Sequence, residues 1–345
     1  MIYPFKKAGS ATTDLVKDYD LKEHYPDVNM NTPWKNLSPS MRQAIRTYVI
    51  PFIGRTLYED ICNKIQADTV LDDVQEEFAE RLKDVCAHYG IMHMLPKKKT
   101  IVASLGAVEN SAKEGTTSSI WGFKTTLWSL VQDADRMMDE LLSFLQEMVE
   151  EGEDYFIENW KDEPAYSSVS SGFFRQVGDF QKYHPINNSL RTFKTLVPFM
   201  DEVSERIILP LICQEQYDRL LAGVKDGDAT DAEKKLIHLV RKVVAKFTVY
   251  EAAIGLPILA EHDGFRVISS TDAIDRLAYD SEAIKMAIQG MREHAERSGN
   301  TAKADLVSHL FSNKSDYPLW ENSPCNKTGL ETFNVHCDGP GAVML

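Results

Sequence analysis

The sequence predicts a mainly α-helical protein, built as a tandem duplication of a helical-bundle module in which each copy has a small β-hairpin, with extended N- and C-terminal arms. Three observations predict this fold class. The stretch from Trp34 to Cys62 returns 159 residues later, from Phe193 to Leu221. Apolar residues recur at helical spacing along most of the chain. With 345 residues, the chain exceeds the size at which one hydrophobic core keeps growing.

The repeat can be followed position by position, without a gap between residues 20 and 62. Where the two copies differ, the substitutions keep their character, as in Trp34 to Phe193. Duplicated structure has this appearance. Identical pairs include Pro26 with Pro185, Pro39 with Pro198, Met41 with Met200, Pro51 with Pro210 and Tyr58 with Tyr217.

The chain divides into five predicted segments. The domain boundary is placed in a linker that contains the serine-rich patch Ser167–Ser171. Both arms carry too many apolar residues for a solvated tail, so each is expected to lie on the body or on a partner subunit. The segments are an N-terminal arm 1–31, helical module 1 at 32–155, a linker 156–178, helical module 2 at 179–312 and a C-terminal arm 313–345.

The first helix of the module is predicted to begin at Ser38, a good N-cap, with Pro39 in the first helical position. Pro51 lacks an amide donor and its ring crowds the preceding turn, so the helix is expected to kink or restart there. Pro210 predicts the same break in the second copy.

The next helix is predicted over about residues 74–95, and Pro96 is expected to stop it. Its counterpart spans about residues 232–256 before Pro257, at an offset that has grown to 161 because two residues were gained in a loop. After each proline, short β-type runs around Gly106 and Gly264 predict a small hairpin.

The closing helix of the first copy is predicted over about residues 124–150 and carries a heptad stripe. About three heptads favour packing inside a helical bundle over an intermolecular coiled coil. The stripe is Leu127, Val131, Ala134, Met138, Leu141, Leu145 and Met148, and at an offset of 150 its counterpart is Leu277, Ser281, Ile284, Ile288, Met291 and Ala295, with smaller and more polar members.

The composition is that of a soluble globular protein and argues against a protein that grips nucleic acid. Hydrophobic residues make up 43% of the chain and charged residues 26%, and the formal net charge is -14. Proteins that hold DNA through its phosphates carry clustered Lys and Arg instead. The acidity fits a surface that merely keeps the protein soluble, or one past which DNA slides without sticking.

The five cysteines form no CxxC pair, and their odd number indicates a reduced intracellular compartment. Cys62, Cys86 and Cys213 lie in apolar helical patterns, where a free thiol behaves as a small hydrophobic side chain. The N-terminus lacks the apolar run of a signal peptide, and no window of about 18 apolar residues predicts a membrane span.

No residue constellation announces a chemistry, so the sequence predicts no catalytic residue, no cofactor and no metal. Cys325, His336 and Cys337 are three candidate zinc ligands, but they lack paired spacing and a clear fourth ligand. The glycine-rich phosphate loops do not occur, and neither do the GxSxG and HExxH motifs. Neighbouring carboxylates are typical of the solvated faces of an acidic protein.

The residues singled out are therefore structural. The two halves are expected to superpose, with Pro51 and Pro210 at equivalent helix breaks and Tyr58 and Tyr217 in equivalent packing positions. The full set comprises the repeat positions Pro51, Tyr58, Pro96, Pro210, Tyr217 and Pro257, and the interface-arm residues Tyr3, Phe5, Tyr317, Trp320 and Phe333.

The repeated unit resembles a module of uncharacterised proteins encoded by phages and prophages of gut Bacteroides-type bacteria. The resemblance covers most of residues 20–310 and is carried by VIPFIGRTLYEDI, HYGIMHMLP and SLGAVEN, echoed by IILPLICQEQYDRL, TVYEAAIGLP and EHDGF. By gene context and helical character, such proteins resemble head-to-tail connector or adaptor components of the phage neck. Tandem duplication departs from the short, single-module adaptors, so the resemblance implies no particular ring stoichiometry.

The resemblance implies a non-enzymatic phage structural protein that forms a homo-oligomeric ring at the portal or neck of the virion, after assembly in the bacterial host cytoplasm. Its implied partners are the portal, other neck or tail proteins, and genomic DNA that passes through the lumen without specific binding, with no membrane. Two alternatives stay open. One is another capsid- or tail-associated assembly scaffold, and the other is an enzyme, such as a hydrolase, whose site is dispersed along the sequence.

Overall fold

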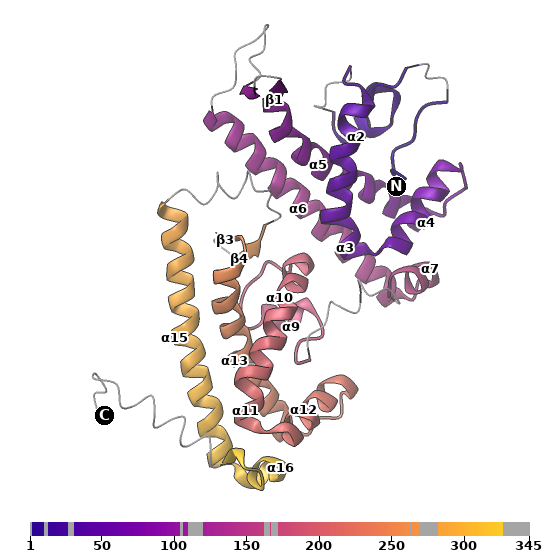
Figure 1. Ribbon diagram of the computed structural model, residues 1–345. Coiled ribbons are helices and arrows are strands. Elements are labelled where there is room, and N and C mark those ends of the chain that lie inside the picture. The colour runs from indigo at the N-terminus through magenta and orange to yellow at the C-terminus, as the bar shows by residue number, and fades with distance from the viewer. Residues whose placement is uncertain are drawn as a thin grey trace. The chain divides into compact units, whose positions relative to one another are not determined.

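The described part of the protein is mainly helical, which confirms the main feature of the predicted fold class (Figure 1). The structure is a computed structural model, and it describes residues 2–9, 13–26, 31–103, 106–109, 120–161, 166, 172–261, 264–268 and 282–326. The chain divides into two compact units. Unit 1 is Met1–Ser168 with Ile268–Glu282, and unit 2 is Val169–Val267 with Ala283–Leu345.

Unit 1 is built around three helices that bury its core. These are α2 (Trp34–Ala44), α5 (Asp73–Lys99) and α6 (Ile120–Glu151). Shorter elements connect and flank them: η1 (Val16–Asp18), α1 (Leu21–His24), η2 (Ile45–Val49), α3 (Ile50–Ile53), α4 (Arg55–Gln66), β1 (Thr100–Ala103), β2 (Gly106–Glu109), α7 (Asp154–Phe156) and η3 (Ile157–Lys161).

From its first long helix to its closing helix, unit 2 has the same kinds of element in the same order as unit 1. Its long helices are α10 (Leu190–Val203), α13 (Asp231–Gly255) and α15 (Glu282–Ser312), and in Figure 1 α15 runs alongside α13. The other elements are α9 (Val177–Gln181), η4 (Ser204–Ile208), α11 (Leu209–Ile212), α12 (Gln214–Asp226), β3 (Ile258–Glu261), β4 (Gly264–Val267), η5 (Lys314–Asp316) and α16 (Pro318–Glu321).

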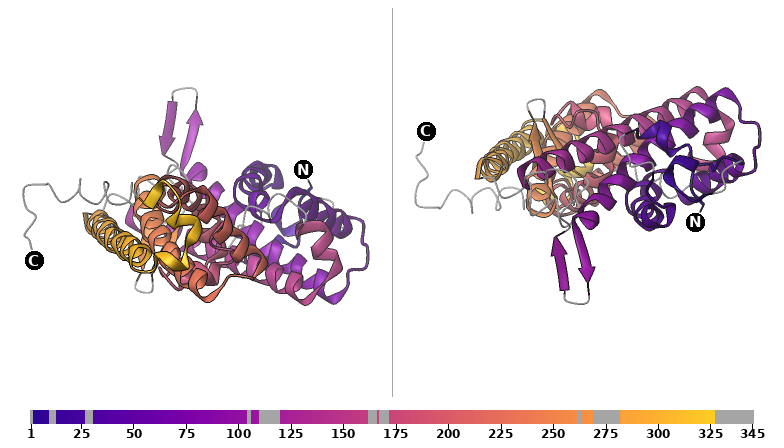
Figure 2. Two further views of the ribbon diagram at one scale, coloured as in Figure 1. Left: turned by 90° about the horizontal axis from the view of Figure 1, so that it is seen from below. Right: turned by 90° about the horizontal axis from the view of Figure 1, so that it is seen from above.

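Two antiparallel strand pairs stand at corresponding places in the units. In unit 1, Thr100 pairs with Glu109 and Ala103 with Gly106. In unit 2, Ile258 pairs with Val267 and Glu261 with Gly264. Figure 2 shows β1 and β2 continuing beyond the adjacent ends of α5 and α6. The turns between the paired strands, at 104–105 and 262–263, lie outside the described residues, so the complete hairpins stay a prediction.

Each unit contains the same junction of short helices, at the place where the sequence predicts a break. A π-helical turn, Ile45–Val49 in unit 1 and Ser204–Ile208 in unit 2, precedes a four-residue helix. Pro51 and Pro210 each occupy the second position of that helix, where a missing amide donor costs little. The two prolines thus hold equivalent positions, in agreement with their offset of 159.

Three residues after each proline, a residue with positive φ separates the four-residue helix from the helix that follows it. Gly54 has φ 82° and ψ 161°, a conformation that glycine adopts without steric cost. Its counterpart is Cys213, with φ 63° and ψ 159°. We refer to Pro51–Gly54 and Pro210–Cys213 as the helix junctions. The proline marks each junction, but the residue with positive φ makes the turn.

The predicted helix start at Ser38 and Pro39 was wrong. Helix α2 begins at Trp34 and α10 at Leu190, so Pro39 and Pro198 lie inside their helices and not in a first position. A proline inside a helix removes one backbone hydrogen bond. Tertiary packing outweighs that loss here, because Trp34, Leu37 and Met41 along α2 are all buried.

Pro96 and Pro257 share a repeat position but act differently. Pro257 follows the C-cap of α13, Leu256, which is extended, as expected for a residue that precedes proline. Helix α5 instead continues to Lys99, past Pro96. The prediction that Pro96 stops its helix was therefore wrong, whereas the equivalent prediction for Pro257 is confirmed.

The closing helices α6 and α15 correspond at an offset of 161, so the offset of 150 used for the predicted stripe was wrong. Contacts between equivalent pairs fix the register. Arg81 lies over the Phe144 ring in unit 1, and Lys242 pairs with Asp305 in unit 2 at 3.4 Å. Both members of the second pair stand 161 residues after the first.

The stripe of α6 is buried as predicted, but the stripe predicted for the second copy is not. Ala295 is buried, whereas Ile288 and Met291 are half-buried, and Leu277 and Ser281 lie outside the described residues, as does the side chain of Ile284. The buried positions among the described side chains of α15 are Ala295, Gly299, Ala302, Leu306, Val307 and Leu310.

Small residues on α15 allow it to approach α13 closely. A Cβ atom at Gly299 would lie 3.0 Å from the ring of Phe247, so glycine leaves room for that ring. The positions 161 residues earlier hold Met138 and Cys86, both buried. In unit 1 the larger side chain of the pair, Met138, is on the closing helix, whereas in unit 2 the larger one, Phe247, is on the facing helix. The exchange conserves the total side-chain volume of the core.

A tryptophan closes each unit by bonding to its helix junction. The indole Nε1–H of Trp160 donates to the carbonyl of Phe52 at 3.2 Å, and that of Trp320 donates to the carbonyl of Leu211 at 2.9 Å. Phe52 and Leu211 both directly follow the junction proline. The last carbonyls of a helix lack intrahelical donors, and the indole supplies one. We call each pair a tryptophan lock.

We predict that Trp160→Phe and Trp320→Phe each destabilise the protein by about 1–2 kcal/mol, because a buried carbonyl loses its indole donor while most of the apolar ring volume is kept. Chemical denaturation of the full chain measures the change. Trp128→Phe is the control, because Trp128 is a half-buried tryptophan on α6. Equal effects of all three substitutions would show that the locks contribute only packing.

Candidate functional site

The N-terminal arm lies on unit 1, where an aromatic cluster holds it. Phe5 is 2% exposed, and its ring centroid lies 6.4 Å from that of Trp34. Trp34 also stacks on Tyr19 at 4.1 Å and meets Tyr3 edge-on at 5.4 Å. Such contacts bury large apolar area, so this arm is part of the body. Tyr3 and Phe5 were predicted on an interface arm, and the structure places both against their own unit.

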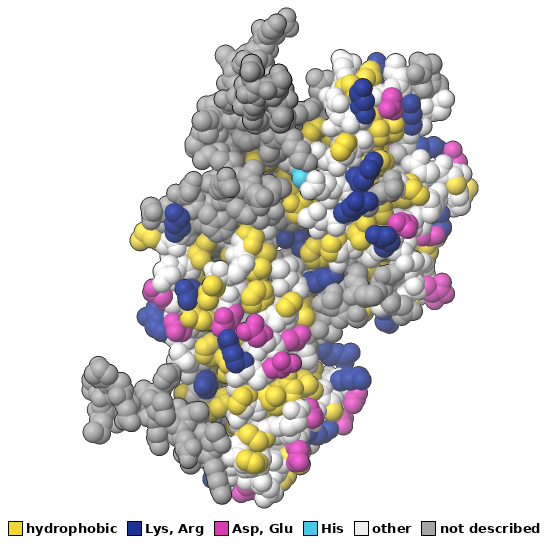
Figure 3. All heavy atoms as spheres, in the orientation of Figure 1, with side chains coloured by type: hydrophobic (Ala, Val, Ile, Leu, Met, Phe, Trp, Pro, Cys, Tyr) yellow, Lys and Arg dark blue, Asp and Glu magenta, His cyan; other side chains and the backbone are white. Residues whose placement is uncertain are grey.

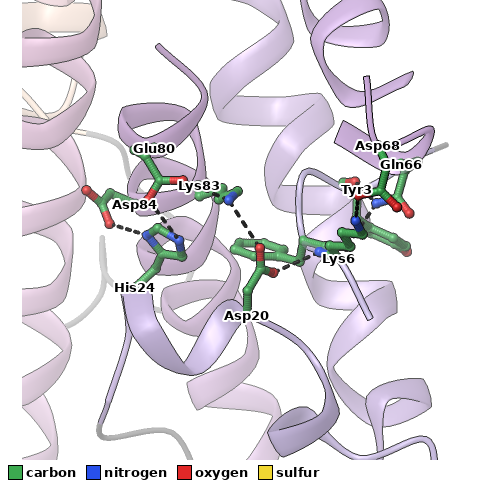
Figure 4. A network of polar contacts seen from close by, with 10 residues as sticks. Tyr3, Lys6, Asp20, His24, Gln66, Asp68, Glu80, Lys83 and Asp84 are labelled. Carbon is green, nitrogen blue, oxygen red and sulfur yellow. Dashed lines mark hydrogen bonds and ion pairs between the residues drawn. The ribbon is translucent and has the colours of Figure 1, made fainter. Parts of the chain in front are cut away.

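Ion pairs tie the arm to helix α5 (Figure 4). His24 is 7% exposed at its side chain, and its ring nitrogens lie 2.8 Å from Asp84 and 3.7 Å from Glu80. Lys83 lies 3.1 Å from Asp20. Its pairing with carboxylates raises the Lys83 pKa even though burial opposes the charge. These contacts join two stretches of chain that are about 60 residues apart.

Backbone carbonyls of the arm are bonded to helix α4. Tyr58, one of the predicted repeat positions, is buried and donates its hydroxyl to the carbonyl of Ile2 at 2.9 Å. Burial raises the pKa of Tyr58, so the hydroxyl keeps its proton and remains a donor. Gln66 donates to the carbonyls of Tyr3 and Phe5, both at 3.0 Å. We call Tyr58, Gln66, Lys83 and Asp84 the arm-docking surface.

Tyr217 occupies the equivalent element of unit 2 but packs differently from Tyr58. It is half-buried, and its ring lies 5.3 Å from that of Phe173. Phe173 and Phe174 are fully buried in unit 2. Trp160, at the other end of the predicted linker, is buried in unit 1. The ends of the segment 156–178 therefore belong to the two units, and the boundary at residue 168 falls inside it.

The first part of the predicted C-terminal arm is folded into unit 2. Tyr317 and Trp320 are each 1% exposed, and Tyr317 donates its hydroxyl to the carbonyl of Ala232 at 2.8 Å. The expectation that both lie on an arm was wrong, because the tryptophan lock and this bond fold them into unit 2. Phe333 lies outside the described residues.

Cys213, predicted as a free thiol, and Cys325, considered as a zinc ligand, form a disulfide. Cys213 is bonded to Cys325, 112 residues further along the chain. Spacing could not reveal this pair, because the chain has no paired cysteine motif. Cys62 and Cys86 are free and buried. Burial raises the pKa of Cys62 to about 12, so it stays protonated and unreactive.

A shallow hollow on unit 2 is lined largely by lysine and histidine residues. It has a volume of about 420 Å³ and is lined by Lys234, Lys235, His238, Leu239 and His309. Lys234 lies 3.3 Å from Asp231, and His309 shares a hydrogen bond of 2.8 Å with the Tyr317 hydroxyl. The walls are mainly apolar. The arrangement therefore lacks the converging donors of a built anion site.

His184 is a largely buried base in unit 2. Its ring lies 5.3 Å from that of Phe265, and its Nδ1 has no hydrogen-bond partner among the described residues. Burial, with Lys246 and His294 nearby, lowers its pKa to about 4. Burial likewise lowers the pKa of Lys194 to about 8. For both side chains, the fold disfavours the charged, protonated form relative to the same group in water.

Among the described residues, no group of three or more His, Cys, Asp or Glu side chains could hold a metal ion. Within the same part of the chain, no helix combines the length and the apolar character that crossing a bilayer requires.

Sequence reasoning missed Trp160 as a functional residue and assigned Trp320 to an arm. The signal was present, since the two tryptophans stand 160 residues apart and close to equivalent positions. Extending the repeat past the closing helix would have paired them. No signal in the sequence indicates the arm-docking surface, because its polar contacts join residues without a common pattern.

A family model described as a family of unknown function, DUF6712, matches the chain twice, over residues 49–168 and 208–329. The two matches cover more than half of the chain, and they are consistent with a two-module repeat. No curated protein and no solved structure matches the chain.

We predict that Gln66→Ala increases tryptic cleavage after Lys6 and Lys7 by about five- to thirtyfold, because the loss of two hydrogen bonds weakens docking of the arm by about 1–2 kcal/mol. Timed proteolysis followed by mass spectrometry measures the rate. Gln146→Ala, which removes a bond to Glu150 on α6, is the matched control. Unchanged cleavage in Gln66→Ala would show that the aromatic cluster alone holds the arm.

We predict that His184 makes the protein less stable as the pH falls from 6.5 to 4. The unfolded state takes up a proton near pH 6.5, whereas the folded state resists it until about pH 4. The loss reaches about 3 kcal/mol at 1.36 kcal/mol per pH unit. Urea unfolding of the native chain and of His184→Asn at pH 7 and pH 4.5 isolates this contribution. Parallel pH profiles of the two proteins would contradict the prediction.

Proposed function

We propose that this chain, which belongs to the DUF6712 family, is a non-enzymatic phage structural protein, a head-to-tail connector that assembles with copies of itself into a ring at the portal or neck. The family match covers both halves of the chain. The proposed partners are the portal, other neck or tail proteins, and genomic DNA that passes through the ring without specific binding. The net charge of -14 favours such a passage, since like charges repel the DNA backbone.

The observation that carries the proposal is an exposed apolar surface on unit 2. Met286 on α15 is 71% exposed and Ile254 on α13 is 57% exposed. Contacts between the helices, Arg292 with Tyr250 and Gly299 with Phe247, show that they run antiparallel, so the end of α13 faces the start of α15. Figure 3 shows hydrophobic side chains on the surface in this region. We call Ile254, Met286, Ile288 and Met291 the α15 surface.

On α15, two of the three residues of the α15 surface are more exposed than their equivalents in unit 1, whereas Met286 corresponds to Thr125, which is exposed as well. At the offset of 161, Ile288 corresponds to Leu127 and Met291 to Leu130, which are 1% and 5% exposed. Duplicated helices with the same apolar spacing therefore differ in burial. Apolar surface that one copy buries and the other leaves exposed is characteristic of a protein interaction site.

A second copy of the chain is the proposed occupant of the α15 surface. Subunits of a ring are joined by repeated contacts between one surface and a different surface of the neighbour. The N-terminal arm is bonded to its own unit, so it does not supply that contact. The proposal therefore rests on the helical body of unit 2, whereas the sequence alone pointed to the arms.

We predict that Met286→Glu and Ile254→Glu each weaken self-association by about ten- to a hundredfold while leaving the helix content unchanged. Burying an apolar side chain of this size contributes about 1.5–3 kcal/mol, and a carboxylate reverses the effect. Light scattering over a concentration series, with and without portal protein, measures the oligomer. Val70→Glu is the matched control, because Val70 is 93% exposed and belongs to unit 1, in the connection between α4 and α5.

A native chain that remains monomeric at all concentrations and is indifferent to portal would overturn the connector proposal. Binding to a different capsid or tail protein would favour the alternative of another assembly scaffold. A stoichiometric metal in the purified protein would favour an enzyme.

A further inference from the structure

Cys213 has a backbone conformation that is essentially confined to glycine. Its φ of 63° and ψ of 159° match those of Gly54, its counterpart in unit 1. A side chain in this region clashes with the backbone, so a residue other than glycine persists there only when its surroundings hold it. Unit 2 therefore has a cysteine at the one position of its helix junction where a side chain is least favoured.

The disulfide and the tryptophan lock hold the same two segments together. Cys325 lies five residues after Trp320, whose indole donates to the carbonyl of Leu211, two residues before Cys213. The Cα atoms of the two cysteines are 5.7 Å apart. One covalent bond and one hydrogen bond thus join the end of α16 to the helix junction.

Unit 1 closes without a covalent bond. Trp160 forms the equivalent lock on Phe52, and Gly54 has no thiol to offer. The free cysteines of unit 1, Cys62 and Cys86, are buried away from solvent. Cys213 and Cys325 are instead half-buried. Among the described residues, covalent closure distinguishes unit 2.

We propose that the Cys213–Cys325 pair is a redox-controlled clasp, which holds α16 on the helix junction when oxidised and loosens it when reduced. The Cys213 thiolate attacks a low-molecular-weight disulfide such as oxidised glutathione, releasing one glutathione thiolate and forming a mixed disulfide. The Cys325 thiolate then attacks the Cys213 sulfur and displaces the second glutathione. The two protein thiols lose two electrons and two protons in total, and glutathione disulfide becomes two thiols. A dithiol reductant reverses both steps.

Reduction has a specific structural consequence in this proposal. It removes a cross-link over 112 residues, and it leaves Cys213 in an unfavourable conformation that the bond no longer enforces. Both effects favour separation of α16 from the junction. The inference concerns the stability of unit 2 and holds whether or not the protein is a connector.

The test compares thermal unfolding of the full chain with and without a phosphine reductant, in the native protein and in two variants. We expect reduction to lower the Tm of the native chain by on the order of 5–10 °C. Cys325→Ser should melt like the reduced native chain and should not respond to reductant. Cys213→Gly should also be unresponsive, but should melt above Cys325→Ser, because glycine restores the residue that unit 1 uses.

Peptide mapping of the non-reduced chain checks the pairing, and Cys337→Ser is the control, in which the response to reductant should persist. A native Tm that is unaffected by reduction would overturn the clasp. So would a mapped bond between Cys325 and Cys337, or a Cys325→Ser chain that still responds to the reductant. Melting of Cys213→Gly below Cys325→Ser would overturn the contribution of the Cys213 conformation.

Discussion

The hydrogen bond from a tryptophan indole to the helix junction is the interaction on which each unit depends. At each junction, a proline and a residue with positive φ separate two helices within four residues. More than 100 residues later in the chain, a tryptophan indole donates a hydrogen bond to a carbonyl of that junction. The closing helix, the strand pair and the long central helix all lie between these two ends in sequence. The lock therefore joins the helix junction, which follows the first long helix, to the segment after the closing helix.

The two units keep the junction and the lock but differ in what surrounds them. Tyr89 of unit 1 donates to the buried carboxylate of Asp135 at 2.7 Å, whereas Tyr250 of unit 2 meets the guanidinium of Arg292. Gly54 of unit 1 corresponds to the disulfide-bonded Cys213. The duplicated backbone thus tolerates different charges and volumes, provided that each pair of facing positions remains complementary.

The units also differ in what they leave exposed, and this difference connects the fold to the proposed function. The first unit buries the apolar stripe of its closing helix from Leu127 onward and receives the N-terminal arm through the aromatic cluster around Trp34. The second unit leaves apolar residues of α15 exposed and closes with a covalent bond. One copy of the module has the features of a self-contained body, and the other those of a surface for assembly.

The sequence by itself determined the helical class, the duplication and the equivalence of Pro51 with Pro210, because these follow from local spacing and identity at a constant offset. Tertiary structure alone decided that Pro39 and Pro96 lie inside helices. It also decided the register of α15, the disulfide partner of Cys213 and the docking of Tyr3 and Phe5. The physical reason is the range of the interactions. Proline and glycine act on their own backbone and leave a mark in the sequence, whereas core packing, a disulfide over 112 residues and the arm contacts depend on which surfaces meet after folding.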